Sequence, residues 1–357
     1  MLPDTLFKRD VFSPSKMVWS PVTNNDTLDY LRSLLQTYYP AIFCKDTSFF
    51  YSGSIEINSK NFLFVSKIGE FVLKQLPKYD QRKINILETI DCKIASQVGM
   101  LPQCILNVSQ QFSTNNGEFF FVVYNKIGIR HYSGTVAELE MFFEKFRLLE
   151  NHTKTISSDS HEIHKVFNEK SIEVFERFLS LESQWPTIFD ERTAEALEEG
   201  MPFAAQVVSL LKSHMFQEHL HKLGLYHIDL HPHNITVDGD ELFFVDIDSI
   251  QVCSMTRSLG FGLFKLIRQS LSNGRDIEPF RDFIQKEILD YVSLYGLTID
   301  DLRVAAHSEV ARRLCLVAKS VMDDGNYDWV FTLPMHLDGL KEINYIFKEV
   351  NYDSVSY

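Results

Sequence analysis

The stretch from Tyr226 to Asp248 limits most strongly what this chain can fold into. It places Asp229 in a histidine-rich polar segment, with Asn234 five residues later. Two short apolar runs follow at 235–237 and 242–245, and the Asp-Gly-Asp turn at 238–240 between them predicts a β hairpin. Asp246 comes directly after the second run, so an apolar strand delivers a carboxylate to the end of a small sheet.

The elements around this hairpin follow a clear order. Residues 48–124 contain short β-prone runs, among them 49–51, 62–65, 71–73, 104–108 and 118–124, interrupted by one helical stretch at 83–98. After residue 130 the spacing of apolar residues predicts helices at 136–149, 172–181, 203–223, 258–271, 277–295, 299–321 and 340–349. Gly224 stands where a helix-ending residue is expected. The order predicts an α+β protein with a small β-rich part and a larger helical part.

We divide the chain into an N-terminal extension (1–45), a β-rich lobe (46–124) and a helical lobe (125–357). The 357 residues are 45% hydrophobic, which is enough for a sizeable core. A net charge of −13 argues against nucleic acid as a partner. The apolar run at 119–124 is too short to cross a membrane. Five scattered cysteines without a CxxC pair indicate reduced thiols in a cytoplasmic protein.

The polar residues of the 227–248 stretch suit phosphoryl transfer. That reaction needs nucleotide phosphates and Mg²⁺ held in line with an acceptor oxygen, and a group that takes the acceptor proton. Asp229 is the candidate base, and Asn234 and Asp246 are candidate oxygen ligands of Mg²⁺. Asp248 is a weaker candidate for a second metal contact, because it could instead bond the local backbone.

The histidines of this region raise zinc as an alternative metal. The segment lacks HExxH, and no cysteine lies at ligand spacing, which disfavours a zinc site. We expect His227 to fix the shape of the loop instead.

Upstream, Lys74 ends an apolar run and Glu88 lies 14 residues later, on the helix of the β-rich part. Their order predicts an ion pair in which Glu88 positions Lys74 on the α- and β-phosphates. The chain has no GxGxxG loop, so the turn at 58–61 is the candidate for amides that bind phosphate. Tyr124 and Asn125 are the candidates for backbone contacts to adenine.

The stretch from Tyr226 to Ile235 resembles the catalytic loop of the kinase-like superfamily, in which protein kinases carry HRDxxxxN followed by DFG. Its Asp-Leu-His-Pro element is similar to the aminoglycoside and choline phosphotransferase branch. With Val245–Asp248 and the segment 262–270, it also resembles bacterial lipopolysaccharide kinases that phosphorylate 3-deoxy-manno-octulosonic acid (Kdo). Lys265 and Arg268 match the basic positions of the last segment. The specific resemblance covers residues 223–271.

The resemblance implies a two-lobed protein-kinase-like fold, ATP, Mg²⁺ and an alcohol acceptor. The leading interpretation is phosphorylation of a carbohydrate hydroxyl in a lipopolysaccharide core or another surface glycan, with a peripheral contact with the inner membrane left open. The alternatives are a small-molecule phosphotransferase of the aminoglycoside or choline type, which the acidic balance of the chain favours mildly, and a bacterial protein kinase. A non-catalytic binding module is disfavoured because no catalytic position is lost.

Overall fold

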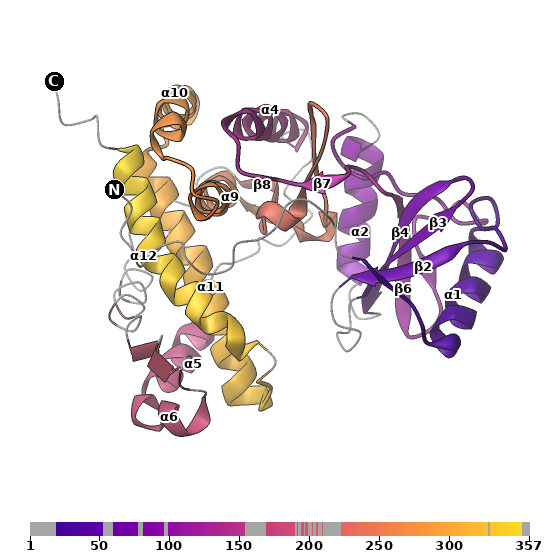
Figure 1. Ribbon diagram of the computed structural model, residues 1–357, viewed down its shortest axis with the longest axis horizontal. Coiled ribbons are helices and arrows are strands. Elements are labelled where there is room, and N and C mark those ends of the chain that lie inside the picture. Colours follow the sequence, from indigo (N-terminus) through magenta and orange to yellow (C-terminus); the bar gives the residue numbers. More distant parts are fainter. Residues whose placement is uncertain are drawn as a thin grey trace.

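The computed structural model describes residues 19–52, 60–77, 81–95, 99–153, 169–189, 223–327 and 329–351, with a few single positions between 191 and 209. They form a small β-rich lobe and a larger helical lobe (Figure 1). The predicted two-lobed α+β architecture is therefore confirmed. None of the described helices is both long enough and apolar enough to span a membrane.

The small lobe is a six-stranded antiparallel sheet in the order β1-β2-β3-β4-β6-β5. Side chains alternate between the two faces of a strand. In β4, Phe71 and Leu73 pack into the hydrophobic cluster on one face of the sheet, whereas Leu76 packs into the cluster on the other face, the face that Lys74 shares. One helix covers each face (Figure 1). These elements are β1 (Ser20–Pro21), α1 (Asn25–Tyr38), β2 (Ser48–Ser52), β3 (Lys60–Ser66), β4 (Gly69–Pro77), α2 (Gln81–Ile90, continued by a π-helical turn at Asp91–Ala95), β5 (Thr114–Asn115) and β6 (Phe119–Asn125).

Residues 19–45, predicted to lie in an extension, are part of this lobe. β1 pairs with β2, and the Asn24 side chain caps α1 by accepting a hydrogen bond from the Thr27 amide at 2.9 Å. Leu31, Leu34 and Leu35 of α1 are buried against the sheet. The reason is physical, since the aromatic face of β2, β3 and β4 would be open to water without α1.

The large lobe is built around α9, which is buried along nearly its whole length. α11 and α12 pack against α9, and α4 packs on the small β-sheets of this lobe (Figure 1). The elements are β7 (Arg130–His131), α4 (Val136–Thr153), α5 (Glu169–Leu179), α6 (Trp185–Ile188), β8 (Leu223–His227), β9 (Ile235–Asp238), β10 (Glu241–Phe244), β11 (Ile250–Ser254), α9 (Met255–Ser272), α10 (Glu278–Tyr295), α11 (Ile299–Asp324) and α12 (Leu333–Val350), with short 3₁₀ turns at Pro232–Asn234, Ile247–Ser249 and Val330–Thr332.

Several local predictions were wrong. Gly224 does not end a helix; it lies in β8, opposite Cys253 of β11, a strand pair that the sequence pattern did not reveal. β8 is buried from residue 224 to 227, so it lacks the alternation that marks a half-exposed strand. The predicted strand at 104–108 is only a single bridge between Cys104 and Tyr124. The predicted helix at 203–223 lies almost wholly outside the described residues. Of the predicted phosphate-binding turn at 58–61, residues 60 and 61 begin β3, and the other two lie outside the described residues.

Candidate active site

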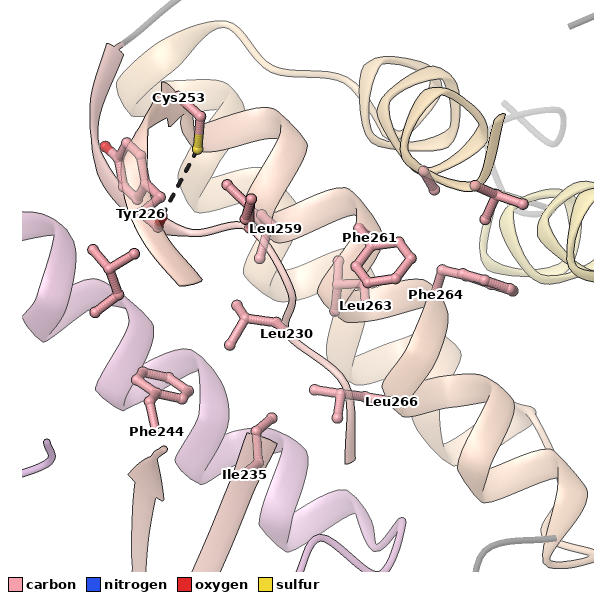
Figure 2. Packing of buried hydrophobic residues seen from close by; sticks show 14 of the residues in the cluster. Tyr226, Leu230, Ile235, Phe244, Cys253, Leu259, Phe261, Leu263, Phe264 and Leu266 are labelled. Atoms are coloured by element: carbon pink, nitrogen blue, oxygen red, sulfur yellow. Dashed lines mark hydrogen bonds between the residues drawn. The ribbon is translucent and has the colours of Figure 1, made fainter. Parts of the chain in front are cut away.

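The candidate catalytic loop follows β8 and is held at both ends. The Asn234 amide nitrogen Nδ2 donates to the Asp229 carbonyl at 2.9 Å, and the Asn234 backbone amide donates to the His231 carbonyl at 2.8 Å. Between them, Leu230 is fully buried and points into the core beside α9 (Figure 2). The loop therefore presents the half-exposed Asp229 from a rigid base.

His227 joins this loop to the segment that carries Asp246. Its Nε2 donates to the Val245 carbonyl at 2.9 Å, and its Nδ1 accepts from the Asp229 backbone amide at 3.2 Å. Burial lowers the pKa of His227, which favours the neutral ring that this pattern requires. His227 thus fixes the shape of the loop, as predicted.

Asp246 lies at the end of the hairpin strand β10. Ile235 pairs with Phe244, and the Val245 amide donates to the Asn234 carbonyl at 2.9 Å, so the hairpin brings Asn234 next to the Asp246 segment. Asp246 has φ 59° and ψ 45°, a left-handed conformation that is uncommon outside glycine. Such conformations cluster at functional sites, where the surrounding structure maintains them.

The donor atoms of this region suit a magnesium ion. The Asn234 side-chain nitrogen donates to the Asp229 carbonyl, and the Asn234 side-chain oxygen accepts no hydrogen bond from the described residues. The Asp246 carboxylate accepts from the Ser249 hydroxyl at 2.7 Å, and Asp248 lies two residues on. Amide and carboxylate oxygens are the hard ligands that Mg²⁺ prefers, with phosphates and water completing the shell. The side chains present therefore fit Mg²⁺ together with a nucleotide.

Lys74 reaches this site from the small lobe, but its partner is not Glu88. The Lys74 ammonium pairs with both Asp246 and Asp248, and Lys83 of α2 pairs with Asp248 at 2.8 Å. Glu88 is exposed on α2, so the predicted Lys74–Glu88 pair is wrong. The inward face of α2 carries Lys83 toward Asp248, and that carboxylate links the two lysines instead.

These pairs set the charge of the carboxylates. Burial alone would raise the pKa of Asp246, but the Lys74 ammonium outweighs burial and lowers that pKa to about 2. Asp246 is therefore ionised at neutral pH, as a metal ligand must be.

The two residues predicted to contact adenine lie inside the sheet. The Asn125 amide donates to the Gln103 carbonyl at 3.0 Å, so it is already bonded within the small lobe. The Tyr124 side chain is buried in the core. The chain crosses to the large lobe just beyond, where Gly128 has φ 72° and a Cβ would lie 2.3 Å from the Thr236 hydroxyl oxygen. Only glycine fits this close approach of the two segments.

Arg313 is a site residue that sequence reasoning missed. It comes from α11, 84 residues after Asp229, and its guanidinium pairs with the Asp229 carboxylate. It also stacks 3.9 Å over the centre of the Phe261 ring. Burial would raise the pKa of Asp229, but Arg313 and His231 outweigh it and hold that pKa well below its usual range. The only local signal was the spacing of Glu309 and Arg313 on one helix turn.

A cavity of about 770 Å³ opens beside Asp229. Its lining comes from the catalytic loop and from α9, α11, the 3₁₀ turn at Val330–Thr332 and α12, elements far apart in the sequence. The residues are Asp229, His231, Pro232, His233, Phe261, Lys265, Arg268, Gln269, Arg313, Leu316, Val317, Trp329, Thr332, Met335 and His336. Lys265 and Arg268, which the sequence resemblance had singled out, line the same cavity as Asp229.

Comparisons by sequence identify no relative, since no family model matches the chain and no curated protein does. Solved structures do match. A spectinomycin phosphotransferase in complex with ADP and spectinomycin has a TM-score of 0.64 at 14% identity, over 90% of this chain and 98% of that one. An amicoumacin kinase in complex with AMP-PNP and Ca²⁺ has a TM-score of 0.58 at 13% identity, over 89% and 95%.

An aminoglycoside phosphotransferase from Alicyclobacillus acidocaldarius has a TM-score of 0.54 at 14% identity, over 89% of this chain and 94% of that one. At such low identity, the likeness establishes the fold and leaves the acceptor open. The chain has the two-lobed, protein-kinase-like fold of these phosphotransferases.

Proposed function

We propose that this protein transfers the γ-phosphoryl group of ATP to a hydroxyl of a carbohydrate acceptor. One observation carries the proposal. Asp229, Asn234 and Asp246 of the large lobe and Lys74 of the small lobe form one bonded constellation at the junction of the lobes, and Asp229 opens onto a cavity. Phosphoryl transfer asks mainly for this kind of positioning and charge stabilisation.

In the proposed reaction, the acceptor hydroxyl oxygen forms a bond to the γ-phosphorus. The bond from that phosphorus to the β–γ bridging oxygen breaks, and its electron pair leaves on ADP. The hydroxyl proton passes to the Asp229 carboxylate. Because Arg313 holds the pKa of Asp229 low, this carboxylate is a weak base that chiefly orients the hydroxyl until the bond to phosphorus has formed.

Nucleotide binding would use the cluster at the lobe junction. Asn234 and Asp246 would hold Mg²⁺, which would neutralise charge on the phosphate oxygens. Lys74, now paired with Asp246 and Asp248, would bond the phosphates from the small-lobe side. Asp248 would keep a counter-charge beside Lys74 and Lys83 when the metal takes Asp246.

The cavity supports a ring-shaped acceptor. Trp329 is 47% exposed and Leu316 is 50% exposed, and both line it. An aromatic and aliphatic wall with a few polar groups is typical of sites for small molecules. We favour a sugar of a lipopolysaccharide core or related surface glycan. The second candidate is a small-molecule phosphotransferase, which the fold neighbours crystallised with spectinomycin and amicoumacin support.

The test replaces Asp229 by asparagine, with Asp238→Asn as the matched control on the exposed end of the hairpin. Purified protein is incubated with ATP, Mg²⁺ and a panel of sugars and glycan extracts, and phosphorylated products are identified by mass spectrometry. We expect Asp229→Asn to lower kcat by about a hundredfold to ten-thousandfold. Full activity of Asp229→Asn would remove Asp229 from the proposed role.

A further inference from the structure

The acceptor cavity is cationic although the chain is acidic. The whole protein carries a net charge of −13. The cavity lining nevertheless contains three basic side chains, Lys265, Arg268 and Arg313, and a single carboxylate, Asp229. His231, His233, His336, Gln269 and Thr332 complete its polar lining. Basic side chains outnumber carboxylates in this lining, and an anionic ligand complements such a lining better than a cationic one.

The carboxylates of Glu309 and Glu342, near the cavity, form ion pairs with arginines. Glu309 is shared by three of them, at 2.6 Å from Arg257, 2.6 Å from Arg312 and 2.5 Å from Arg313. Glu342 bonds Arg268 at 2.5 Å. Every arginine beside the cavity therefore has a protein counter-charge.

Lys265 has no such partner among the described residues. Its ammonium lies over the rings of Phe261 and Phe264, 5.5 and 5.3 Å from their centres, and it forms no ion pair with any carboxylate in the described residues. Burial, together with Arg268 and Arg313, lowers the pKa of Lys265 to about 7. A partly desolvated ammonium without a counter-ion is costly, and an anion bound beside it would offset that cost.

His336 supplies a second, independent observation. It lines the cavity from α12 and is only 7% exposed. Its Nδ1 has no hydrogen-bond partner in the part of the chain that the structure describes. Buried polar atoms are nearly always satisfied, so the unpaired Nδ1 of this cavity-lining histidine is a candidate hydrogen-bond partner for a bound ligand group.

We propose that the acceptor carries a carboxylate or phosphate group, and that Lys265, Arg268 and His336 bind this anion while Asp229 engages the hydroxyl to be phosphorylated. The proposal rests on the proposed function, because it takes this cavity as the acceptor site. It narrows the acceptor to acidic sugars or sugar phosphates. It also disfavours polycationic aminoglycosides, whose ammonium groups would face three basic side chains.

The test measures binding of four related sugars by calorimetry in the presence of Mg²⁺ and a non-hydrolysable ATP analogue. Glucuronic acid carries a carboxylate, glucose 6-phosphate a phosphate, glucose is neutral and glucosamine is cationic. We expect at least one of the two anions to bind about tenfold or more tightly than glucose, and glucosamine to bind worst. The stronger of the two anionic probes identifies the group. Equal affinities, or no measurable binding of either anion, would overturn the proposal.

Variants test which side chain causes the preference for anionic sugars. Lys265→Met is expected to abolish the advantage of the anion, and Lys265→Arg to retain most of it. Lys319→Met, an exposed position on α11 outside the cavity lining, is the matched control and should bind like the unmodified protein. An anion preference that survives in Lys265→Met contradicts the assignment.

The proposed function fails in a different way. Without nucleotide binding, the ATP analogue with Mg²⁺ produces no thermal shift in unmodified protein, whatever the sugars do. A thermal shift with the nucleotide but equal affinity for the four sugars refutes only the anion site.

Discussion

Two charged clusters flank the catalytic loop, and they differ in how they are built. The junction cluster takes Lys74 and Lys83 from the small lobe and Asp246 and Asp248 from the large lobe. The arginine cluster, which consists of Glu309 with Arg257, Arg312 and Arg313, lies within the large lobe on α9 and α11. Glu309 is fully buried, whereas the Asp246 side chain keeps 29% of its exposure.

The difference separates structural charges from functional ones. A fully buried carboxylate among arginines pairs inside one rigid lobe, so breaking it leaves uncompensated charge in the core. Pairs that span two lobes can be exchanged for metal and phosphates without unpacking either lobe. The arginine cluster therefore belongs to the fold, and it positions Asp229 through Arg313. We propose that the junction cluster forms the nucleotide site.

The largest effect is expected from Asp246→Asn. Loss of this carboxylate should lower kcat/KM for ATP by about a thousandfold, equivalent to about 4 kcal/mol of transition-state stabilisation. The melting temperature should change little, because Lys74 keeps Asp248 as a partner. Steady-state kinetics and thermal denaturation check both points, with the exposed Asp240→Asn as control. A large fall in stability would show that the junction cluster is structural as well.

Glu309→Gln tests the other cluster and should act mainly on stability. Removing the shared carboxylate from Arg257, Arg312 and Arg313 is expected to lower the free energy of unfolding by about 3–5 kcal/mol, measured in urea. Glu140→Gln, on the exposed face of α4, is the control and should be within about 0.5 kcal/mol of the unmodified protein.

The same variant should change the response to acid. The arginines outweigh burial and lower the pKa of Glu309 from 4.5 to about 2 in the folded protein. Its stabilisation is therefore complete above pH 4.5 and is lost as the pH falls toward 2. The difference in unfolding free energy between Glu309→Gln and the unmodified protein should shrink over this range. A constant difference would contradict the ion pairing.

Lys83→Met should have the smallest effect. Lys83 pairs with Asp248 and so ties α2 to the large lobe. We expect kcat/KM for ATP to fall about five- to tenfold, which is roughly 1 kcal/mol. Lys67→Met, in an exposed pair with Asp46, is the control. The double variant Lys83→Met/Asp248→Asn should lose little more kcat/KM for ATP than Asp248→Asn alone. Fully additive losses would contradict the proposal that Lys83 acts through Asp248.

The candidate residues that the structure brings together share a physical basis for their placement. Asp229, Asn234 and Asp246 lie within 18 residues of one another, and a hairpin with a two-residue turn leaves little freedom in how its ends meet. Lys74 was proposed from its position in an apolar strand, and the structure places its ammonium beside Asp246. The partner predicted for Lys74 was wrong because the sequence does not distinguish Glu88 from Asp248, since both are acidic. Only the packing of α2 against the large lobe decides which carboxylate faces the lysine.

The sequence by itself determined the order of most elements, the hairpin of β9 and β10 and the types of side chain at its ends. Local hydrogen bonding and the periodicity of apolar residues act over a few residues, so they can be read along the chain. Only the tertiary structure brought Arg313, Trp329 and His336 to Asp229, and these residues line the cavity beside it. Helices distant in sequence contribute them, and their meeting depends on the burial of α9 at the centre of the large lobe.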